Sequence, residues 1–173
     1  MIYTIKQGQH YCEQTRVEAH DGKISWTVRA MLGEDCLYNL NSKKYNQQSN
    51  KLEGRGYGLN HHQDSVRVAW RPVFDSTTWL VPQNKFGILA YYYNKGTMYA
   101  KSMFQVQPNE WFEYTVTCDR VNNTLTYTSP KLKVPKIYYF DWSNVPVWGY
   151  KLYFYFGGDK TYPKNMDMEM NYL

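Results

Sequence analysis

The sequence of 173 residues has little of what several protein classes require. It contains three cysteines, Cys12, Cys36 and Cys118, and none of them forms a CxxC pair. Because an odd number cannot all pair within one chain, we expect reduced thiols that are buried as small apolar side chains. It also lacks a long apolar run, so the sequence predicts no transmembrane helix. No basic stretch followed by an apolar run opens it, so we expect no signal peptide and synthesis in the cytoplasm.

Motifs of the common catalytic classes are also missing. The sequence contains no G-x-S-x-G, no Walker A motif and no GxGxxG. The glycines of residues 54–58 lack the Lys-Ser/Thr pair of a phosphate loop, so this segment is interpreted as a flexible loop. Asp167 and Glu169 alternate with three methionines, a pattern that is typical of a solvated strand face rather than of an acid pair in a cleft. The sequence therefore predicts no catalytic residue.

Metal ligands and cofactor motifs are equally scarce. His61 and His62 are adjacent, and adjacent residues on a strand point to opposite faces. No HxH or HxxxH pattern supplies the further ligands that zinc needs. We therefore expect no metal site and no cofactor.

Aromatic residues, in contrast, are abundant, with 18 Tyr, 7 Phe and 6 Trp. Tyrosine and tryptophan combine an apolar ring with a polar group, which suits strands, interfaces and sugar-facing surfaces. The formal net charge is +5, and the basic residues are spread along the chain rather than gathered in a patch. This distribution argues against nucleic acid as a partner.

Alternation of apolar and polar residues dominates the chain and predicts strands. The sequence contains no segment of helical period, so we expect an all-β, two-sheet antiparallel jelly-roll sandwich with little helix. Its last strand is expected beside an N-terminal strand at residues 2–6. The expected core includes Trp26, Val28, Val68, Trp70 and Tyr114. Strands are predicted within residues 23–32, 65–74, 86–93, 98–106, 111–118, 124–128, 150–156 and 166–172.

The domain organisation is simple. We expect one domain over residues 1–173, because this length is typical of a single domain and no linker or repeat interrupts it. Residues 39–64 are polar and dotted with glycine, and they are predicted to form a long irregular loop. Such loops are uncommon in compact domains and often carry function.

A candidate glycan site lies on one predicted strand and its neighbours. Arg67 and Arg71 share a strand face, and Tyr91 or Tyr93 lies across from them if the next strand pairs in register. Guanidinium groups bind carboxylates in a forked geometry and stack on rings, and sugars bind such surfaces. The alternative is an ordinary Arg–acid pair with cross-strand aromatic packing. The predicted glycan-binding set consists of Tyr57, His62, Arg67, Arg71, Tyr91 and Tyr93.

Two segments carry a resemblance to a known group of proteins. Residues 60–71 read NHHQDSVRVAWR, and residues 150–159 read YKLYFYFGGD, with Pro163 following. They resemble an HHxxSxRxxWR block and a YKLYxYFGG close found in largely uncharacterised bacterial and phage β-sandwich proteins. The general architecture is similar to concanavalin A-like jelly rolls. That group typically has Pro-His before the last strand, where this chain has Pro163-Lys164, so a role for that histidine is absent. The resemblance implies a jelly-roll sandwich and no established activity.

Two functions remain open from the sequence. The first is a non-enzymatic binding or assembly module, such as a phage-type virion or surface structural protein with lectin-like glycan binding. Its partners would be protein subunits of an assembly, including copies of itself, or glycans. The alternative is a glycan-active lyase or hydrolase on the same fold, with His61, His62, the arginines and the tyrosine run as its base and charge-neutralising groups. Fold alone cannot choose between them.

Overall fold

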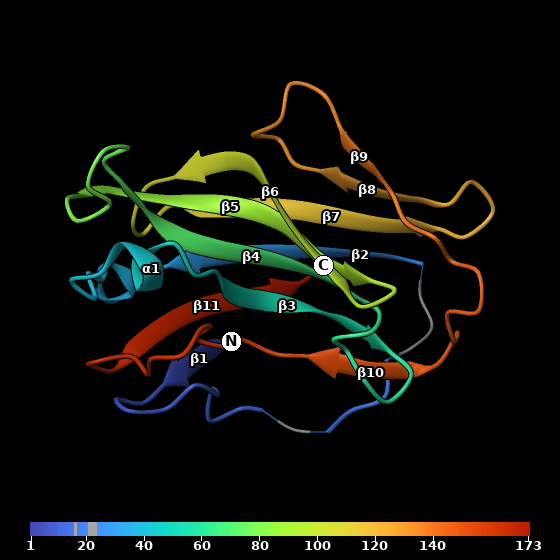
Figure 1. The fold of residues 1–173 in the computed structure, drawn as a ribbon, viewed down its shortest axis with the longest axis horizontal. Coiled ribbons are helices and arrows are strands. Elements are labelled where there is room, and N and C mark those ends of the chain that lie inside the picture. The colour runs from blue at the N-terminus through green and yellow to red at the C-terminus, as the bar shows by residue number, and fades with distance from the viewer. Residues whose placement is uncertain (16, 21–23) are drawn as a thin grey trace.

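The protein is a sandwich of two antiparallel sheets, as shown by a computed structural model that describes residues 1–15, 17–20 and 24–173. In Figure 1 the two sheets lie one behind the other, with the strands of each stacked from the bottom to the top of the view. The first has the order β1 (Ile2–Ile5), β11 (Met166–Tyr172), β2 (Ser25–Leu32), β7 (Trp111–Asp119), β8 (Thr124–Thr128), β9 (Lys136–Tyr139). The second has the order β10 (Gly149–Leu152), β3 (Asn50–Tyr57), β4 (Ser65–Phe74), β5 (Pro82–Asn94), β6 (Thr97–Val106). The predicted all-β, two-sheet antiparallel architecture is confirmed.

Helix is confined to two short segments in the described part of the chain. These are the 3-10 helix Glu34–Cys36 and α1 (Lys43–Asn46). None of the described helices has the length and apolar character needed to cross a membrane.

The core fills the space between the sheets, and strand alternation determines what enters it. In β2, Trp26, Val28, Ala30 and Leu32 are buried, while the residues between them are exposed or half-buried. All five predicted core residues are buried. Ile24 continues the same alternation, yet it is 62% exposed because it lies before β2 begins. The three cysteines are free and buried, as predicted.

The two ends of the chain meet inside one sheet. β1 pairs with β11 from Ile2 opposite Glu169 to Ile5 opposite Met166, as predicted for the terminal strands. β11 also pairs with β2, so it occupies an interior position in the six-stranded sheet. Its three methionines, Met166, Met168 and Met170, are buried.

The predicted loop over residues 39–64 is wrong in its second half. This segment contains α1 and the strand β3, which lies between β10 and β4. A register shift between Lys51 and Gly54 marks a bulge, and it places Glu53 as well as Leu52 in the buried interior. Polar and glycine residues therefore make a strand here because pairing on both sides satisfies its backbone, which local alternation could not reveal.

A buried ion pair lies on β3 between the sheets. The Glu53 carboxylate accepts a hydrogen bond from Arg55 at 3.0 Å and another from the Trp26 indole of the facing sheet. The Arg55 guanidinium lies 4.7 Å from the centre of the Trp26 ring. Burial raises the pKa of the Glu53 carboxyl, and the adjacent charge of Arg55 opposes that rise.

Candidate functional site

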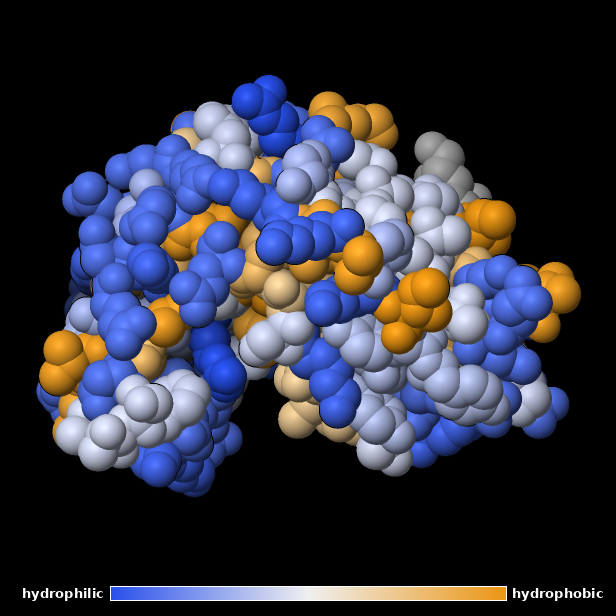
Figure 2. Space-filling view, turned by 90° about the horizontal axis from the view of Figure 1, so that it is seen from above, coloured by the Kyte–Doolittle hydropathy of each residue, from blue (hydrophilic) through white to orange (hydrophobic). Residues whose placement is uncertain are grey.

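The main cavity of the described structure lies on the face of the five-stranded sheet that points away from the core. Its volume is about 820 Å³. Strands β3, β4, β5 and β10 supply its floor and one wall, and the N-terminal segment supplies Tyr11, Thr15 and Val17. Figure 2 shows a deep notch on the side of the molecule that faces the viewer in Figure 1. The remaining lining residues are Lys51, His61, His62, Ser65, Arg67, Tyr91, Tyr93, Tyr150, Lys151, Leu152, Tyr153, Tyr155, Gly158 and Asp159.

Strand register brings an arginine and two tyrosines together on the cavity floor. Arg67 lies directly opposite Tyr91, and Ser65 lies directly opposite Tyr93. On the other side of β4, Gly54 lies opposite Arg67. A Cβ at this glycine would lie 2.5 Å from Arg67 Cγ and 2.2 Å from the Val66 carbonyl oxygen. The missing side chain therefore leaves the space in which the Arg67 side chain lies.

Arg67 is a buried cation with unused hydrogen-bonding capacity. Its Nη2 donates to the Tyr153 carbonyl oxygen at 2.7 Å, while Nε has no partner among the described residues. Burial lowers the pKa of the guanidinium to about 10, so the group stays charged at neutral pH. The buried hydroxyl of Ser65, also without a partner among the described residues, lines the same cavity. Unpaired buried donors cost free energy, so this part of the cavity favours a ligand that carries acceptors.

Lys51 adds a second cation from β3. Its Nζ donates to the Ser49 carbonyl oxygen at 2.6 Å and lies 4.8 Å from the centre of the Tyr91 ring. The Tyr155 ring lies on another side, at 5.8 Å. Burial, together with the nearby charge of Arg67, lowers the pKa of Lys51 to about 7. Its charge therefore changes close to neutral pH.

Two histidines lie at the opposite end of the cavity. His61 Nδ1 and the Tyr150 hydroxyl are 2.7 Å apart, within hydrogen-bond distance, and the ring of His62 lies 4.3 Å from that of His61. Burial lowers the pKa of His61 to about 4, with smaller contributions from His62, Arg67 and Lys51, so the ring is neutral at neutral pH. The expectation that the two histidines point to opposite faces is wrong, because residues 61–63 form a turn rather than a strand. Across the described residues, no group of three His, Cys, Asp or Glu side chains could hold a metal ion.

The tyrosines form a connected set of rings between these groups. The Tyr91 and Tyr93 rings are 5.9 Å apart, and His62 meets Tyr93 edge-on at 5.1 Å. Burial, the largest cause, raises the pKa of the Tyr91 phenol, and its hydrogen bond to Tyr93 adds to this, so it is protonated over the physiological range. The floor thus combines neutral proton donors, a neutral imidazole and two cationic side chains.

Four of the six predicted site residues, His62, Arg67, Tyr91 and Tyr93, line the cavity. Arg71 lies outside the lining; its guanidinium donates to the Gln47 carbonyl oxygen at 2.8 Å and lies 5.2 Å from the Trp79 ring. Although Arg71 is on the same strand face as Arg67, it lies four residues further along β4. There it contacts the segment after α1 and the loop between β4 and β5.

The prediction that Tyr57 is a loop residue of the glycan-binding site is wrong. It is buried, and its hydroxyl lies 3.4 Å from Cys118 Sγ of the facing sheet. The Trp142 ring packs edge-on against it at 5.2 Å. After the bulge in β3, Gly54 and Gly56 face outward and Tyr57 faces the core, so its ring cannot reach a ligand in the cavity.

The sequence did not single out several of the lining residues. Ser65 could have been found, because it shares a strand face with Arg67. Lys51 lies in the segment interpreted as a loop, and Tyr153 and Tyr155 belong to a segment whose outward face was not assigned. These residues reach the cavity through long-range contacts: residue 155 bridges to both Tyr11 and Lys51.

Carboxylates are nearly absent from this cavity. Among the lining residues that the structure describes, Asp159 is the one acid, and it is ion-paired with Lys44 at 3.2 Å. Glycoside hydrolysis needs two acids facing one another across the bond that is broken. The cavity does not provide them, whereas its cations and proton donors fit an acidic ligand.

Comparison with solved structures shows the same fold in polysaccharide lyases. Alginate lyase vAL-1 from a Chlorella virus superimposes with a TM-score of 0.56 at 12% identity, covering 99% of this chain and 81% of that one. An alginate lyase from Alteromonas sp. 272 gives 0.54 at 8% identity, covering 100% and 86%. A family 18 polysaccharide lyase, aly-SJ02, gives 0.50 at 8% identity with the same coverage. The chain shares the jelly-roll sandwich of these lyases. No protein-family model and no curated protein matches its sequence.

These neighbours correct the functional prediction. We expected first a non-enzymatic assembly module and only second a glycan-active enzyme. The three structures named above are lyases, which contradicts the first hypothesis and favours the stated alternative. At 8–12% identity the likeness shows the fold, so the activity of this chain is argued below from its own residues.

Proposed function

We propose that the protein is a polysaccharide lyase that cleaves an acidic glycan containing uronate residues. The observation that carries this proposal is the buried guanidinium of Arg67, whose Nε lacks a partner among the described residues and which lies opposite Tyr91 on the cavity floor. A buried cation with a free donor matches a carboxylate in charge and geometry. The alginate lyases of the same fold act on a substrate of this chemical class, which supports the same reading.

The chemistry of a lyase agrees with the groups present. In β-elimination a base removes the proton from the carbon beside the uronate carboxylate, and the electron pair forms a C=C bond. The glycosidic C–O bond on the next carbon breaks, and a proton is delivered to the leaving oxygen. No water is added, so the reaction needs no pair of carboxylates. It needs a group that stabilises the charge of the carboxylate, a base and an acid.

Each role has a candidate in the cavity. Arg67, aided by Lys51 when protonated, would hold the uronate carboxylate and stabilise the negative charge that develops on it. His61, neutral at neutral pH and hydrogen-bonded to Tyr150, would accept the proton. Tyr91, whose raised pKa keeps it protonated, would donate one to the leaving oxygen. Hydrolysis, the other enzymatic alternative, is disfavoured by the shortage of acids.

The test is an assay on alginate and other polyuronates that follows the ultraviolet absorbance of the unsaturated product. We expect cleavage by the wild-type protein. We expect Arg67→Lys and Tyr91→Phe to lower kcat/KM by about 100-fold or more, the scale of a lost acid or electrostatic group. Arg29→Lys and Tyr139→Phe, at exposed positions of the other sheet, are matched controls that should leave the rate unchanged.

Two results would contradict the proposal. One is the absence of unsaturated product from every acidic glycan with a correctly folded protein. The other is cleavage that yields saturated ends, which would indicate hydrolysis. Circular dichroism of each variant separates a lost function from a lost fold.

A further inference from the structure

A cluster of basic and aromatic residues lies next to one end of the cavity and belongs to no site described above. It consists of Lys44, Tyr45 and Lys160. Two ammonium groups lie close to the Tyr45 ring, with Lys44 Nζ at 5.3 Å and Lys160 Nζ at 5.4 Å from its centre. The lysines are exposed and Tyr45 is half-buried. We call these three residues the lysine–tyrosine platform.

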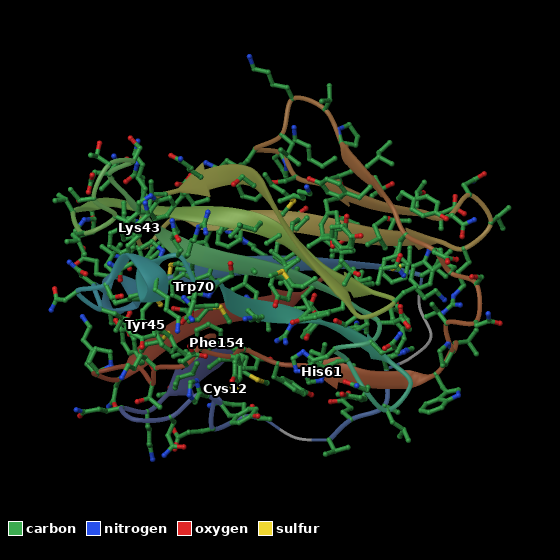
Figure 3. All side chains as sticks on the ribbon, viewed as in Figure 1. Cys12, Lys43, Tyr45, His61, Trp70 and Phe154 are labelled. Carbon is green, nitrogen blue, oxygen red and sulfur yellow. The ribbon has the colours of Figure 1, made fainter. Side chains whose placement is uncertain are left out.

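The platform is continuous with the cavity. Asp159 lines the cavity, and its carboxylate is 3.2 Å from Lys44 Nζ on the platform. Its backbone NH donates to the Gln48 side chain just after α1, at 3.3 Å. Figure 3 shows Tyr45 and His61 well apart along the length of the molecule. A chain lying in the cavity, from the histidines past Arg67 to Lys51, would therefore leave it over the platform.

Charge complementarity identifies the occupant. The platform carries two lysines, Lys44 and Lys160, against the single carboxylate of Asp159. An exposed Lys–Asp pair contributes little free energy, so a polyanion can replace that carboxylate at small cost. Cations attract the carboxylates of successive uronates, and the Tyr45 ring offers a face on which a sugar can stack.

We infer that the platform is a second binding site for the same acidic polysaccharide, holding uronate residues beyond those at the point of cleavage. The inference rests on the proposed function, and it specifies how that function is exerted. The protein would bind long chains more tightly than short ones and would cut within a polymer rather than at its end.

The test measures equilibrium binding of uronate oligomers of two lengths by calorimetry. Tyr91→Phe serves as the background, so that the ligand survives the measurement. The short oligomer fills the cavity alone, and the long one also reaches the platform. We expect Lys44→Gln/Lys160→Gln to weaken binding of the long oligomer by roughly fivefold, the scale of two exposed ion pairs. Binding of the short oligomer should change by less than about twofold.

Controls separate specific binding from net charge. Lys101→Gln/Lys133→Gln removes the same charge at exposed positions outside the cavity lining and should change neither affinity. Tyr45→Leu should weaken binding of the long uronate oligomer but leave binding of polyglutamate of equal charge unchanged, because only a sugar ring stacks on Tyr45.

Three results would overturn the inference. The first is an unchanged affinity for the long oligomer in the platform variant. The second is an equal loss of affinity for the short and the long oligomer. The third is a loss of polyglutamate affinity in Tyr45→Leu that equals the loss for the long uronate oligomer. The proposed function fails separately, when wild-type protein yields no unsaturated product. Length-dependent binding remains measurable in that case, so the two failures are distinguishable.

Discussion

At the scale of single residues, burial sets the protonation states on which the proposed chemistry depends. Burial disfavours the charged form of every ionisable group, so it keeps His61 neutral and Tyr91 protonated. Arg67 stays charged because an arginine pKa is ordinarily so high that, even when burial lowers it to about 10, it remains above neutral pH. Lys51 starts lower and is brought to about 7. Burial thus produces a base, an acid and two unequal cations in the lining of one cavity.

Lys51 predicts a pH dependence of substrate binding. Its ammonium is charged below about pH 7 and neutral above, so the attraction to uronate is present at lower pH and lost as the pH rises through 7. We expect the KM for a uronate polymer to rise over that interval at constant ionic strength. In Lys51→Met, KM at lower pH should already be higher than that of the wild type, and it should not change further as the pH rises. A variant whose KM follows the wild-type curve would assign the titration to another group.

At the scale of the elements, β3 connects the core to the cavity. One face buries the Glu53–Arg55 pair between the sheets, and the other contributes Lys51 and the space above Gly54 that Arg67 uses. The buried Glu53 of this strand is stabilised by hydrogen bonds from other strands, donated by Trp26 and Tyr172. Its glycines Gly54 and Gly56 are needed because neighbouring segments of the chain approach the strand closely at these positions.

Gly54 yields a prediction with an internal control. In Gly54→Ala the new methyl would overlap the Val66 carbonyl and Arg67, so we expect a loss of about 1–3 kcal/mol in the free energy of unfolding. Lyase activity should fall with it, because Arg67 must move. In Gly87→Ala on β5 the nearest atom is 3.8 Å away, and stability should be unchanged or rise by up to about 1 kcal/mol. Urea unfolding measures both; equal effects would refute the packing argument.

At the scale of the whole molecule, the C-terminal strand completes a sheet that begins at the N-terminus. β11 lies between β1 and β2, and its methionines enter the core while Glu169 lies on the opposite face. The sandwich is therefore closed only when the last residues of the described chain are in place. Its outer cavity depends on the same closure, since the N-terminal segment following β1 contributes Tyr11 to the wall.

Two neighbouring residues of β11 test this arrangement. Met168→Ala should lower the free energy of unfolding by about 2–5 kcal/mol, because a buried side chain leaves a cavity between the sheets. Glu169→Ala, one residue away on the other face, should change it by no more than about 0.5 kcal/mol. Denaturant unfolding of the two variants compares them directly. A small effect of Met168→Ala would mean that β11 packs loosely on the core.

Much of the site could be predicted from the sequence, and the residues that were missed depend on contacts between distant segments. The shared face of Ser65 and Arg67 follows from strand alternation, and the pairing of Arg67 with Tyr91 follows from the two adjacent strands in the chain. Lys51 and Tyr155 reach the cavity through a bridge between residues far apart in the sequence, and Tyr153 lies there beside Arg67, which donates to its carbonyl oxygen. Tyr57 was misplaced because a bulge in β3 changes which residues face outward. The relation to bacterial and phage proteins with similar blocks stays a prediction.

The sequence by itself determined the all-β class, the two hairpins formed by β5–β6 and β7–β8, and most of the core. These features depend on local alternation and turn residues, which the chain displays directly. Only the tertiary structure decided that a polar, glycine-dotted segment is an interior strand. It also decided that Arg67 is buried without a full set of partners, and that the outer face of a sheet is a cavity rather than a surface. Pairing partners and burial are set by distant segments, which alternation within one strand does not encode.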